Sequence, residues 1–210
     1  MKEPKQNKFF YKLITFFLRP LIKIFFPYEI VGAENINVLN QGYILCPNHL
    51  SNIDPIFFIV SHPKPIRFMA KAELFKNKIL KWFFEDILGA FPVKRGKGDG
   101  KAILKAQQIL NGGDVLGIFI EGTRSKTGEF LRPKSGAAVL AATSSVPVLP
   151  VCITGIAPDN KVHVFKKTII KYGIPIMPQE LNITGSSVVS RSELKSATNL
   201  IMDRIKELRN

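Results

Sequence analysis

Short apolar runs alternate with longer stretches of helical periodicity along the chain from residue 28 onward. Apolar runs of strand length, bounded by glycine, proline or charge, predict buried strands. They fall at residues 42–46, 64–69, 90–93, 115–120, 146–154 and 162–172. Apolar positions at helical spacing predict helices at residues 56–60, 73–88, 101–110, 135–144 and 192–208. This alternation predicts an α/β fold, with a largely parallel or mixed sheet flanked by helices.

No internal repeat and no linker rich in glycine, serine or proline interrupts this pattern. The sequence therefore predicts one domain at residues 28–210, preceded by an appendage at residues 1–27. The chain of 210 residues is long enough for such a domain to bury a hydrophobic core.

The appendage has the pattern of an amphipathic helix. At 100° per residue its cations fall in one arc of about 60°; they are Lys5, Lys8, Lys12, Arg19 and Lys23. Large apolar side chains fall opposite; they are Phe10, Leu13, Phe17, Leu21, Ile24 and Phe25. This arrangement favours a helix in the plane of a membrane interface. Pro20 predicts a division into two helices, with Pro20 in the first turn of the second.

Two other interpretations of the appendage remain open. It could be a helix packed on the core with a solvated basic face, or a signal peptide. A signal peptide is disfavoured because Lys12, Arg19 and Lys23 interrupt any apolar core and no small-residue cleavage site follows. A transmembrane span is excluded because the apolar runs are far shorter than about 20 residues.

The chain is strongly basic, with 30 Lys and Arg against 16 Asp and Glu, yet 46% of its residues are hydrophobic. Such a hydrophobic fraction excludes a disordered basic tail. The excess charge predicts an anionic partner: nucleic acid, a membrane surface or a phosphorylated substrate. Residues 1–27 and 64–105 carry net charges of +5 and +7, whereas residues 28–63 contain no Lys or Arg.

The first candidate for chemistry lies in this cation-free stretch. His49 and Asp54 follow the predicted strand at 42–46 and are five residues apart, so they cannot share one face of a helix. They can meet if His49 lies in the loop before a helix that Ser51 or Asn52 caps. Asp54 would then hold one ring nitrogen, and the other could accept a proton from a hydroxyl group. The alternative is a histidine that only caps the helix.

A second polar cluster follows the predicted strand at 115–120, at the strand end where α/β folds bind ligands. Arg124 offers a bidentate fork for phosphate, and Gly122 lets backbone approach closely. An ordinary turn with a solvated arginine is the alternative. Arg95, before a glycine-rich stretch, could also hold phosphate, although a loop without function fits that pattern as well.

Other segments carry weaker signals. Pro147 and Pro150 lie in an apolar strand that suits either a pocket wall or an edge strand. His62 and His163 lack a matching acid and are expected to be structural. No set of His, Cys, Asp and Glu has the spacing of metal ligands, and no nucleophile elbow is present.

Taken in order, four segments resemble the motifs of the glycerolipid acyltransferase family, the 1-acylglycerol-3-phosphate O-acyltransferases. They are N-H-x4-D at residues 48–54, a glycine-to-arginine block at 89–95, E-G-T-R-S at 121–125 and a proline-containing block at 146–151. The first and third blocks are specific as a pair, and the resemblance covers residues 30–175.

This resemblance implies a role for each matching position. His49 would be the general base, oriented by Asp54. The phosphate of the acceptor would be bound by Arg95, Glu121, Gly122, Thr123 and Arg124, with Lys71 resembling a further lysine near the acceptor site. Pro147 and Pro150 would shape the acyl or donor region.

The expected activity is acyl transfer from acyl-CoA or acyl-carrier protein to lysophosphatidic acid, giving phosphatidic acid. A thioester is already activated, so no metal or other cofactor is expected. We expect a peripheral or monotopic protein on the cytoplasmic face of the cell membrane, held on anionic phospholipid by the N-terminal segment.

Two alternatives differ in class. One is the same chemistry on another lysophospholipid or on glycerol 3-phosphate. The other is a basic membrane-binding or nucleic-acid-binding module without catalysis. Nucleic acid is not an expected partner, because the N-terminal aromatic residues lie opposite the cations and cannot interleave with bases.

Overall fold

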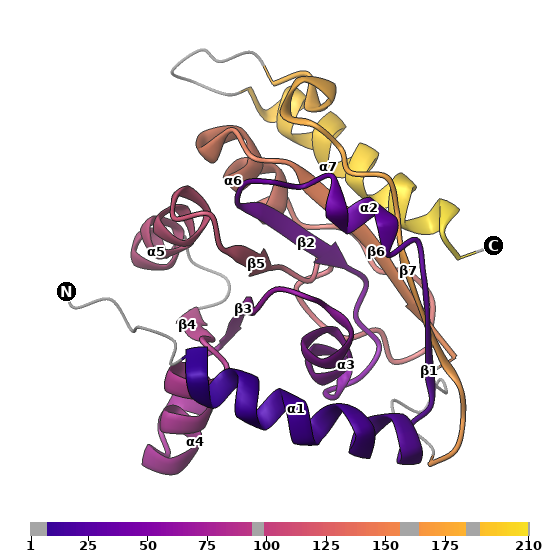
Figure 1. Ribbon diagram of the computed structural model, residues 1–210. Helices are drawn as coiled ribbons and strands as arrows, with labels where there is room; N and C mark the ends of the chain where they lie inside the picture. Colours follow the sequence, from indigo (N-terminus) through magenta and orange to yellow (C-terminus); the bar gives the residue numbers. More distant parts are fainter. Residues whose placement is uncertain (1–7, 94–98, 156–163, 184–189, 210) are drawn as a thin grey trace.

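The computed structural model describes residues 8–93, 99–155, 164–183 and 190–209, and its centre is a sheet (Figure 1). Seven strands lie in the order β1-β7-β6-β2-β5-β3-β4, and every neighbouring pair is parallel except β6 with β7. The strands are β1 (Tyr28–Val31), β2 (Tyr43–Pro47), β3 (Ile66–Lys71), β4 (Phe91–Val93), β5 (Val115–Gly117), β6 (Val148–Thr154) and β7 (Thr168–Tyr172). The expected α/β fold is confirmed.

Helices cover both faces of this sheet (Figure 1). The helices on one face are α5 (Gly100–Asn111), α6 (Gly136–Ser144) and α7 (Arg191–Glu207), and those on the other are α1 (Lys8–Phe25) and α3 (Asp54–Ser61). The central strand β2 sends Ile44 and Cys46 into the first layer and Tyr43 and Leu45 into the second. Burial on both faces is why this strand reads as an unbroken apolar run.

The helix α1 continues through Pro20, so the expected division into two helices is wrong for residues 8–25. A proline removes one hydrogen bond from a helix, but packing on both sides of it can hold the axis together. Tyr11 and Thr15 before Pro20, and Ile22 after it, are all buried. The Arg19 guanidinium also donates to the backbone carbonyl of His62, at 3.2 Å.

The buried face of α1 is not its most apolar face. The large apolar side chains expected opposite the cations are exposed to solvent; they are Phe10, Leu13, Phe17, Leu21, Ile24 and Phe25. Phe16, with 70% of its surface exposed, adds to them. The helix therefore packs on the core and still exposes an apolar face to solvent. None of the helices in the described ranges has the length and apolarity to cross a membrane.

Most other expected elements are found within a few residues of their positions. The strand expected at 162–172 is found as β7 only from Thr168, and residues 162–163 lie outside the described ones. One further stretch differs clearly. The stretch expected as one helix at 73–88 is broken into a 3-10 turn η1 (Ala72–Phe75), α4 (Lys78–Trp82) and a π-helical turn η2 (Phe83–Ile87). Asn77 causes the break, because its side chain caps α4 by accepting from the backbone N–H groups of Ile79 and Leu80.

Three short elements lack a sequence signal. They are β1, α2 (Glu34–Asn37) and the 3-10 turn η3 (Pro178–Leu181). The proline-containing segment forms β6. The expectation that it is an edge strand is wrong, because β6 lies between β2 and β7 in the sheet.

A glycine allows one close contact in the sheet that bears on the candidate site. A Cβ atom at Gly117 would lie 2.3 Å from the ring of Phe68 on the neighbouring strand β3. The missing side chain thus lets the Phe68 ring lie directly over β5 and stack on Phe119, with ring centroids 5.5 Å apart.

Replacing Gly117 with alanine should therefore displace Phe68 and lower the free energy of unfolding by about 1–3 kcal/mol, as overpacking of a core does. Gly136→Ala is the matched control, because a Cβ atom there meets nothing within 4 Å. Denaturant unfolding of both variants checks this. Equal stability of the two would show that the Phe68 ring is free to move away.

Candidate active site

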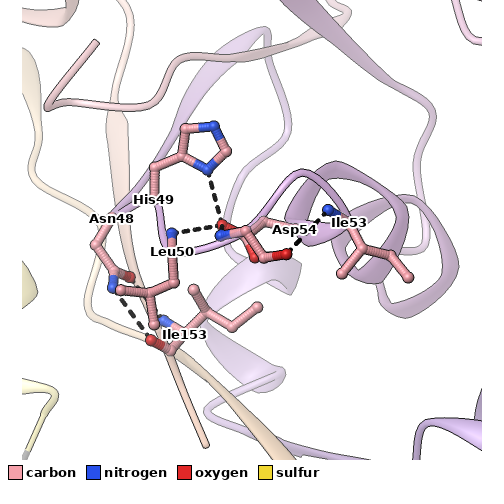
Figure 2. A network of polar contacts seen from close by, with 7 residues as sticks. Asn48, His49, Leu50, Ile53, Asp54 and Ile153 are labelled. Atoms are coloured by element: carbon pink, nitrogen blue, oxygen red, sulfur yellow. Dashed lines mark hydrogen bonds and ion pairs between the residues drawn. The ribbon is translucent and has the colours of Figure 1, made fainter. Parts of the chain in front are cut away.

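The loop after β2 is fastened to β6 by the side chain of Asn48 (Figure 2). Its amide nitrogen donates to the carbonyl of Ile153 at 3.1 Å, and its oxygen accepts from the N–H of Ile153 at 2.8 Å. The amide group thus forms the two hydrogen bonds that a backbone peptide would form, and extends the β2–β6 ladder by one pair of hydrogen bonds. This buried clamp fixes the point at which the chain leaves the sheet.

His49 comes next and meets Asp54, as its place in a loop before a helix predicts. Nδ1 of His49 lies 2.7 Å from Oδ2 of Asp54. The same oxygen accepts from the backbone N–H groups of Leu50, at 2.7 Å, and Ser51, at 2.8 Å. Because a carboxylate accepts, Nδ1 carries the proton in this pair, and in the neutral imidazole the lone pair is on Nε2.

The start of α3 differs from expectation. Ser51 and Asn52 do not cap the helix, because α3 begins at Asp54 and its N-cap residue, Ile53, makes no side-chain cap bond. Instead the Asp54 carboxylate turns back onto the loop and accepts from N–H groups that precede the helix (Figure 2). The loop is thereby wrapped around a carboxylate that has no exposed surface.

The His49 ring is held from one side by an aromatic stack. It lies face to face with Phe119, with centroids 3.8 Å apart and planes 18° from parallel. Phe119 in turn stacks on Phe68. Together with the bond to Asp54, this stack fixes both the position and the plane of the imidazole, of which 11% remains exposed.

The segment after β5 continues alongside the His49 loop. Ile120 donates to the carbonyl of Pro47 at 3.1 Å, and Ser125 donates to the carbonyl of His49 at 2.9 Å. Between them the chain turns at Gly122, whose φ of +68° is one that L-residues rarely adopt. These bonds bring the two polar clusters of the sequence together at the carboxyl ends of adjacent strands.

Glu121 lies behind this turn, in the protein interior. Its Oε1 atom accepts from the N–H of Leu131 at 3.2 Å. Burial raises the pKa of this carboxyl to about 7, with the Asp54 carboxylate adding to the rise and backbone hydrogen bonds from Leu131 and His49 opposing it. The side chain therefore holds the backbone at Leu131, on the segment that follows the turn.

A cavity of about 460 Å³ opens in front of His49. This volume lies in the range of small-molecule sites, about 300–1,000 Å³. The polar side chains around it are those of His49, Asn52, Lys71, Thr123 and Arg124. The remaining wall is apolar, made by Pro55, Ile59, Phe68, Met69, Ala70, Leu74, Phe84, Leu88, Ala90 and Phe119. A ligand with an anionic head group and an apolar body would match a cavity with cationic side chains on one part of its wall and apolar side chains on the rest.

The structure thus gathers some of the expected site residues and separates others. His49, Lys71, Thr123 and Arg124 share the cavity, with Asp54 directly behind His49. The cavity lining includes neither Glu121 nor Gly122.

The two prolines expected in the acyl or donor region, Pro147 and Pro150, are buried and do not line the cavity either. Pro150 shares its strand face with Val148 and Cys152, which pack toward α6 and α7. The cavity lies on the opposite side of the sheet, where Phe68 and Ile59 belong to the other core cluster. The expected contribution of Arg95 lies outside the described residues.

The remaining histidine of the described ranges has a structural role, as expected. His62 is buried, with Nε2 2.7 Å from the Tyr43 hydroxyl, and burial lowers its pKa to about 4. His163 lies outside the described residues. Across the described ranges, no three His, Cys, Asp or Glu side chains gather into a possible metal site.

Several residues of the site carry no recognisable chemistry in the sequence. Asn48 stands in the first motif, but its partner is 105 residues away. Phe119 reads as part of a buried strand, although it lies beyond the end of β5. Only its position two residues before Glu121 could have suggested a place beside the polar cluster.

Comparison with known proteins agrees with this geometry. A family model described as "Acyltransferase" matches residues 28–154. The 1-acyl-sn-glycerol-3-phosphate acyltransferase of Bacillus subtilis is 30% identical over 203 residues, which cover 95% of this chain and 97% of that protein. The enzyme of the same name from Streptococcus pneumoniae is 35% identical over 126 residues, covering 59% of this chain and 46% of that protein.

A solved structure is similar over nearly the whole chain. It is the crystal structure of the 1-acyl-sn-glycerophosphate (LPA) acyltransferase PlsC from Thermotoga maritima, with a TM-score of 0.71 and 26% sequence identity. The match covers 95% of this chain and 79% of the other.

The raised pKa of Glu121 gives a pH dependence of stability with a definite sign. The folded protein holds this proton more tightly than the unfolded chain, whose glutamate has a pKa of 4.5. The stability that this adds is complete below about pH 4.5 and is lost as the pH rises through about 7. Glu121→Gln, which keeps an oxygen for the Leu131 N–H and cannot ionise, should therefore gain stability relative to the native chain between about pH 5 and pH 8.

Urea unfolding of both proteins at these two pH values measures the difference. We expect the variant to gain on the order of 1–3 kcal/mol relative to the native chain. If the difference in free energy of unfolding between variant and native chain did not change with pH, or changed with the opposite sign, Glu121 would be ionised throughout this pH range.

Proposed function

The chain belongs to the acyltransferase family, and we propose that it transfers an acyl group from a thioester to the free hydroxyl of 1-acylglycerol 3-phosphate. The product would be phosphatidic acid. The observation that carries this proposal is the His49–Asp54 pair at one end of an apolar cavity bordered by Arg124 and Lys71. The names of the similar proteins support the same acceptor.

The proposed mechanism uses His49 as the general base. Nε2 takes the proton from the acceptor hydroxyl while the oxygen forms a bond to the thioester carbonyl carbon. The tetrahedral intermediate then collapses, the carbon–sulfur bond breaks, and the imidazolium returns its proton to the departing thiolate. Asp54 stabilises the imidazolium through Nδ1 and keeps the ring in the tautomer that leaves Nε2 free.

The acceptor phosphate would lie against the cationic border of the cavity. Arg124 offers two parallel N–H donors to a phosphate, and Lys71 adds a positive charge from the end of β3. Thr123 adds a hydroxyl donor beside them. Arg95 stays a further candidate on its motif alone.

For Glu121 and Gly122 we propose a supporting role in place of direct phosphate contact. A buried carboxylate facing a phosphate would repel it, whereas one bonded to backbone holds the loop that carries Arg124. The positive φ of Gly122 turns that loop toward the cavity. For Pro147 and Pro150 the geometry supports only a place in the sheet.

The apolar wall of the cavity would receive an acyl chain. Its position next to His49 suits the carbon tail of either substrate, since both reacting groups must meet at Nε2. The donor thiol would be coenzyme A or the prosthetic group of acyl-carrier protein, and no further cofactor is needed for this chemistry.

We also propose that α1 holds the protein peripherally on the cytoplasmic face of the membrane. Its exposed phenylalanines would enter the acyl boundary, and Lys12 and Lys23 would face anionic headgroups. The negative surface potential of that leaflet favours a basic protein.

The catalytic proposal is tested by removing the base. His49→Ala should lower kcat for acyl transfer about 10³-fold or more, and Asp54→Asn should lower it about 10²–10⁴-fold, because the ring loses its tautomer partner. Thiol release from acyl-CoA with lysophosphatidic acid present measures this. Circular dichroism and cooperative unfolding serve as the control for folding. Near-normal turnover by folded His49→Ala would refute the mechanism.

The acceptor proposal separates binding from chemistry. Arg124→Gln should raise the KM for lysophosphatidic acid about tenfold or more, while the KM for the thioester changes little. Repeating the measurement with a neutral monoacylglycerol tests whether the arginine reads the phosphate. If the variant raised both acceptor KM values equally, Arg124 would not be the phosphate ligand. Lysophosphatidylglycerol and glycerol 3-phosphate in the same assay define the acceptor class.

A further inference from the structure

A second apolar surface, formed by elements other than α1, lies on the segment of residues 72–87. This segment contains η1, α4 and η2, and neither η1 nor α4 has a buried residue. Ile79 and Trp82 expose 75% and 54% of their surfaces, and Leu74, Leu80 and Phe83 are exposed as well. Neighbouring large apolar side chains that are exposed together often mark an interaction site.

The inner side of the same segment forms part of the cavity. Leu74, Phe84 and the adjoining Leu88 line the space in front of His49. Phe84 also contacts Phe75 and Phe83, with ring centroids 6.2 and 5.6 Å away. Leu74 belongs to both, since it lines the cavity and is also exposed, so the outer apolar surface adjoins the proposed substrate site.

The charges on this segment fit an anionic surface. Lys76, Lys78 and Lys81 are exposed along it, against the acidic side chains Glu73 and Glu85 among those described. Glu85 lies 3.7 Å from Lys81. Aromatic and aliphatic side chains surrounded by lysines are typical of a segment lying at the level of lipid headgroups, where Trp is favoured and Lys reaches outward.

The segment also continues the surface that α1 presents. Helix α1 contacts η2, and Figure 1 shows α4 beside the N-terminal end of α1 on the same side of the molecule. A flat bilayer could therefore touch both at once. A protein partner would need a shaped surface for two separate elements, so we consider a lipid surface the better fit.

We propose that residues 72–87 form a second lipid-contacting surface, through which the lysolipid acceptor passes from the bilayer into the cavity. This inference rests on the proposed function, since it assumes an acceptor that resides in a membrane. It assigns to Ile79 and Trp82 contact with lipid, and to Leu74 and Phe84 the wall between lipid and His49.

The chain contains a single tryptophan, Trp82, so its fluorescence reports on this surface alone. The full chain is mixed with vesicles of equal parts phosphatidylglycerol and phosphatidylcholine, with and without bromine on the acyl chains. We expect emission to shift to shorter wavelength and to be quenched by the brominated lipid. Sedimentation with the same vesicles shows whether the protein is bound.

Three results would overturn the proposal. One is bound protein with unshifted, unquenched emission, which would leave α1 as the contact. Another is a failure to bind the vesicles at all. The third is a shift that depends on protein concentration without lipid, which would assign the surface to a second copy of the chain.

A matched pair of variants tests the route of entry. Ile79→Gln should lower the ratio of turnover with vesicle-embedded lysophosphatidic acid to turnover with a short-chain, water-soluble acceptor by about tenfold, the equivalent of burying one aliphatic side chain. Ile174→Gln, with 74% of Ile174 exposed beyond β7, should not change it. An unchanged ratio in Ile79→Gln refutes entry along this surface.

The two acceptors also keep this proposal separate from the proposed function. If neither protein nor variant transfers acyl groups to the soluble acceptor, the proposed function fails, whatever Trp82 reports. If the soluble acceptor is used but the ratio does not depend on Ile79, only the lipid entrance fails.

Discussion

One buried carboxylate organises the candidate site. Asp54 has no contact with solvent, and a carboxylate in that environment is tolerated only when hydrogen-bond donors surround it. Here the donors are the imidazole of His49 and two backbone N–H groups of the preceding loop. All three donate to Oδ2, so the loop is folded around this one oxygen. The need to satisfy this charge therefore selects the loop shape, and the loop shape fixes where Nε2 points.

The rest of the site makes that conformation rigid from outside. Asn48 ties the loop to β6, Ser125 ties it to the segment after β5, and Phe119 covers the ring. The residues that hold the loop lie on or directly after β2, β5 and β6. Because β5 and β6 are both parallel to β2, the three strands end at the same edge of the sheet. The imidazole proposed as the base is thus held in position before a substrate arrives and needs little reorganisation.

Local sequence rules were sufficient for the parts of the site that are close in sequence. His49 and Asp54 could be paired because a five-residue spacing excludes one helical face and permits a loop and the following helix. The position of Arg124 followed from a strand end. The stack of Phe119 and Phe68 could not be predicted, because it depends on β3 lying next to β5 and on Gly117 leaving room for a ring.

The same reasoning explains the errors. Local propensity predicts that Pro20 breaks the helix. Packing decides the outcome instead, since Tyr11 and Ile22 are buried on either side of Pro20. The motif groups Glu121 with the phosphate ligands, whereas the side chain is buried and accepts from the backbone N–H of Leu131. In both cases the deciding contact lies outside the local pattern: Arg19 of the helix donates to His62, and Glu121 accepts from Leu131.

The clamp between Asn48 and Ile153 also orders events during synthesis. Its two halves are 105 residues apart, so the strand that receives Asn48 leaves the ribosome long after the histidine has been made. A chain that has not yet formed β6 lacks this clamp on the loop that carries His49. Completion of the sheet and positioning of the His49 ring therefore become a single step.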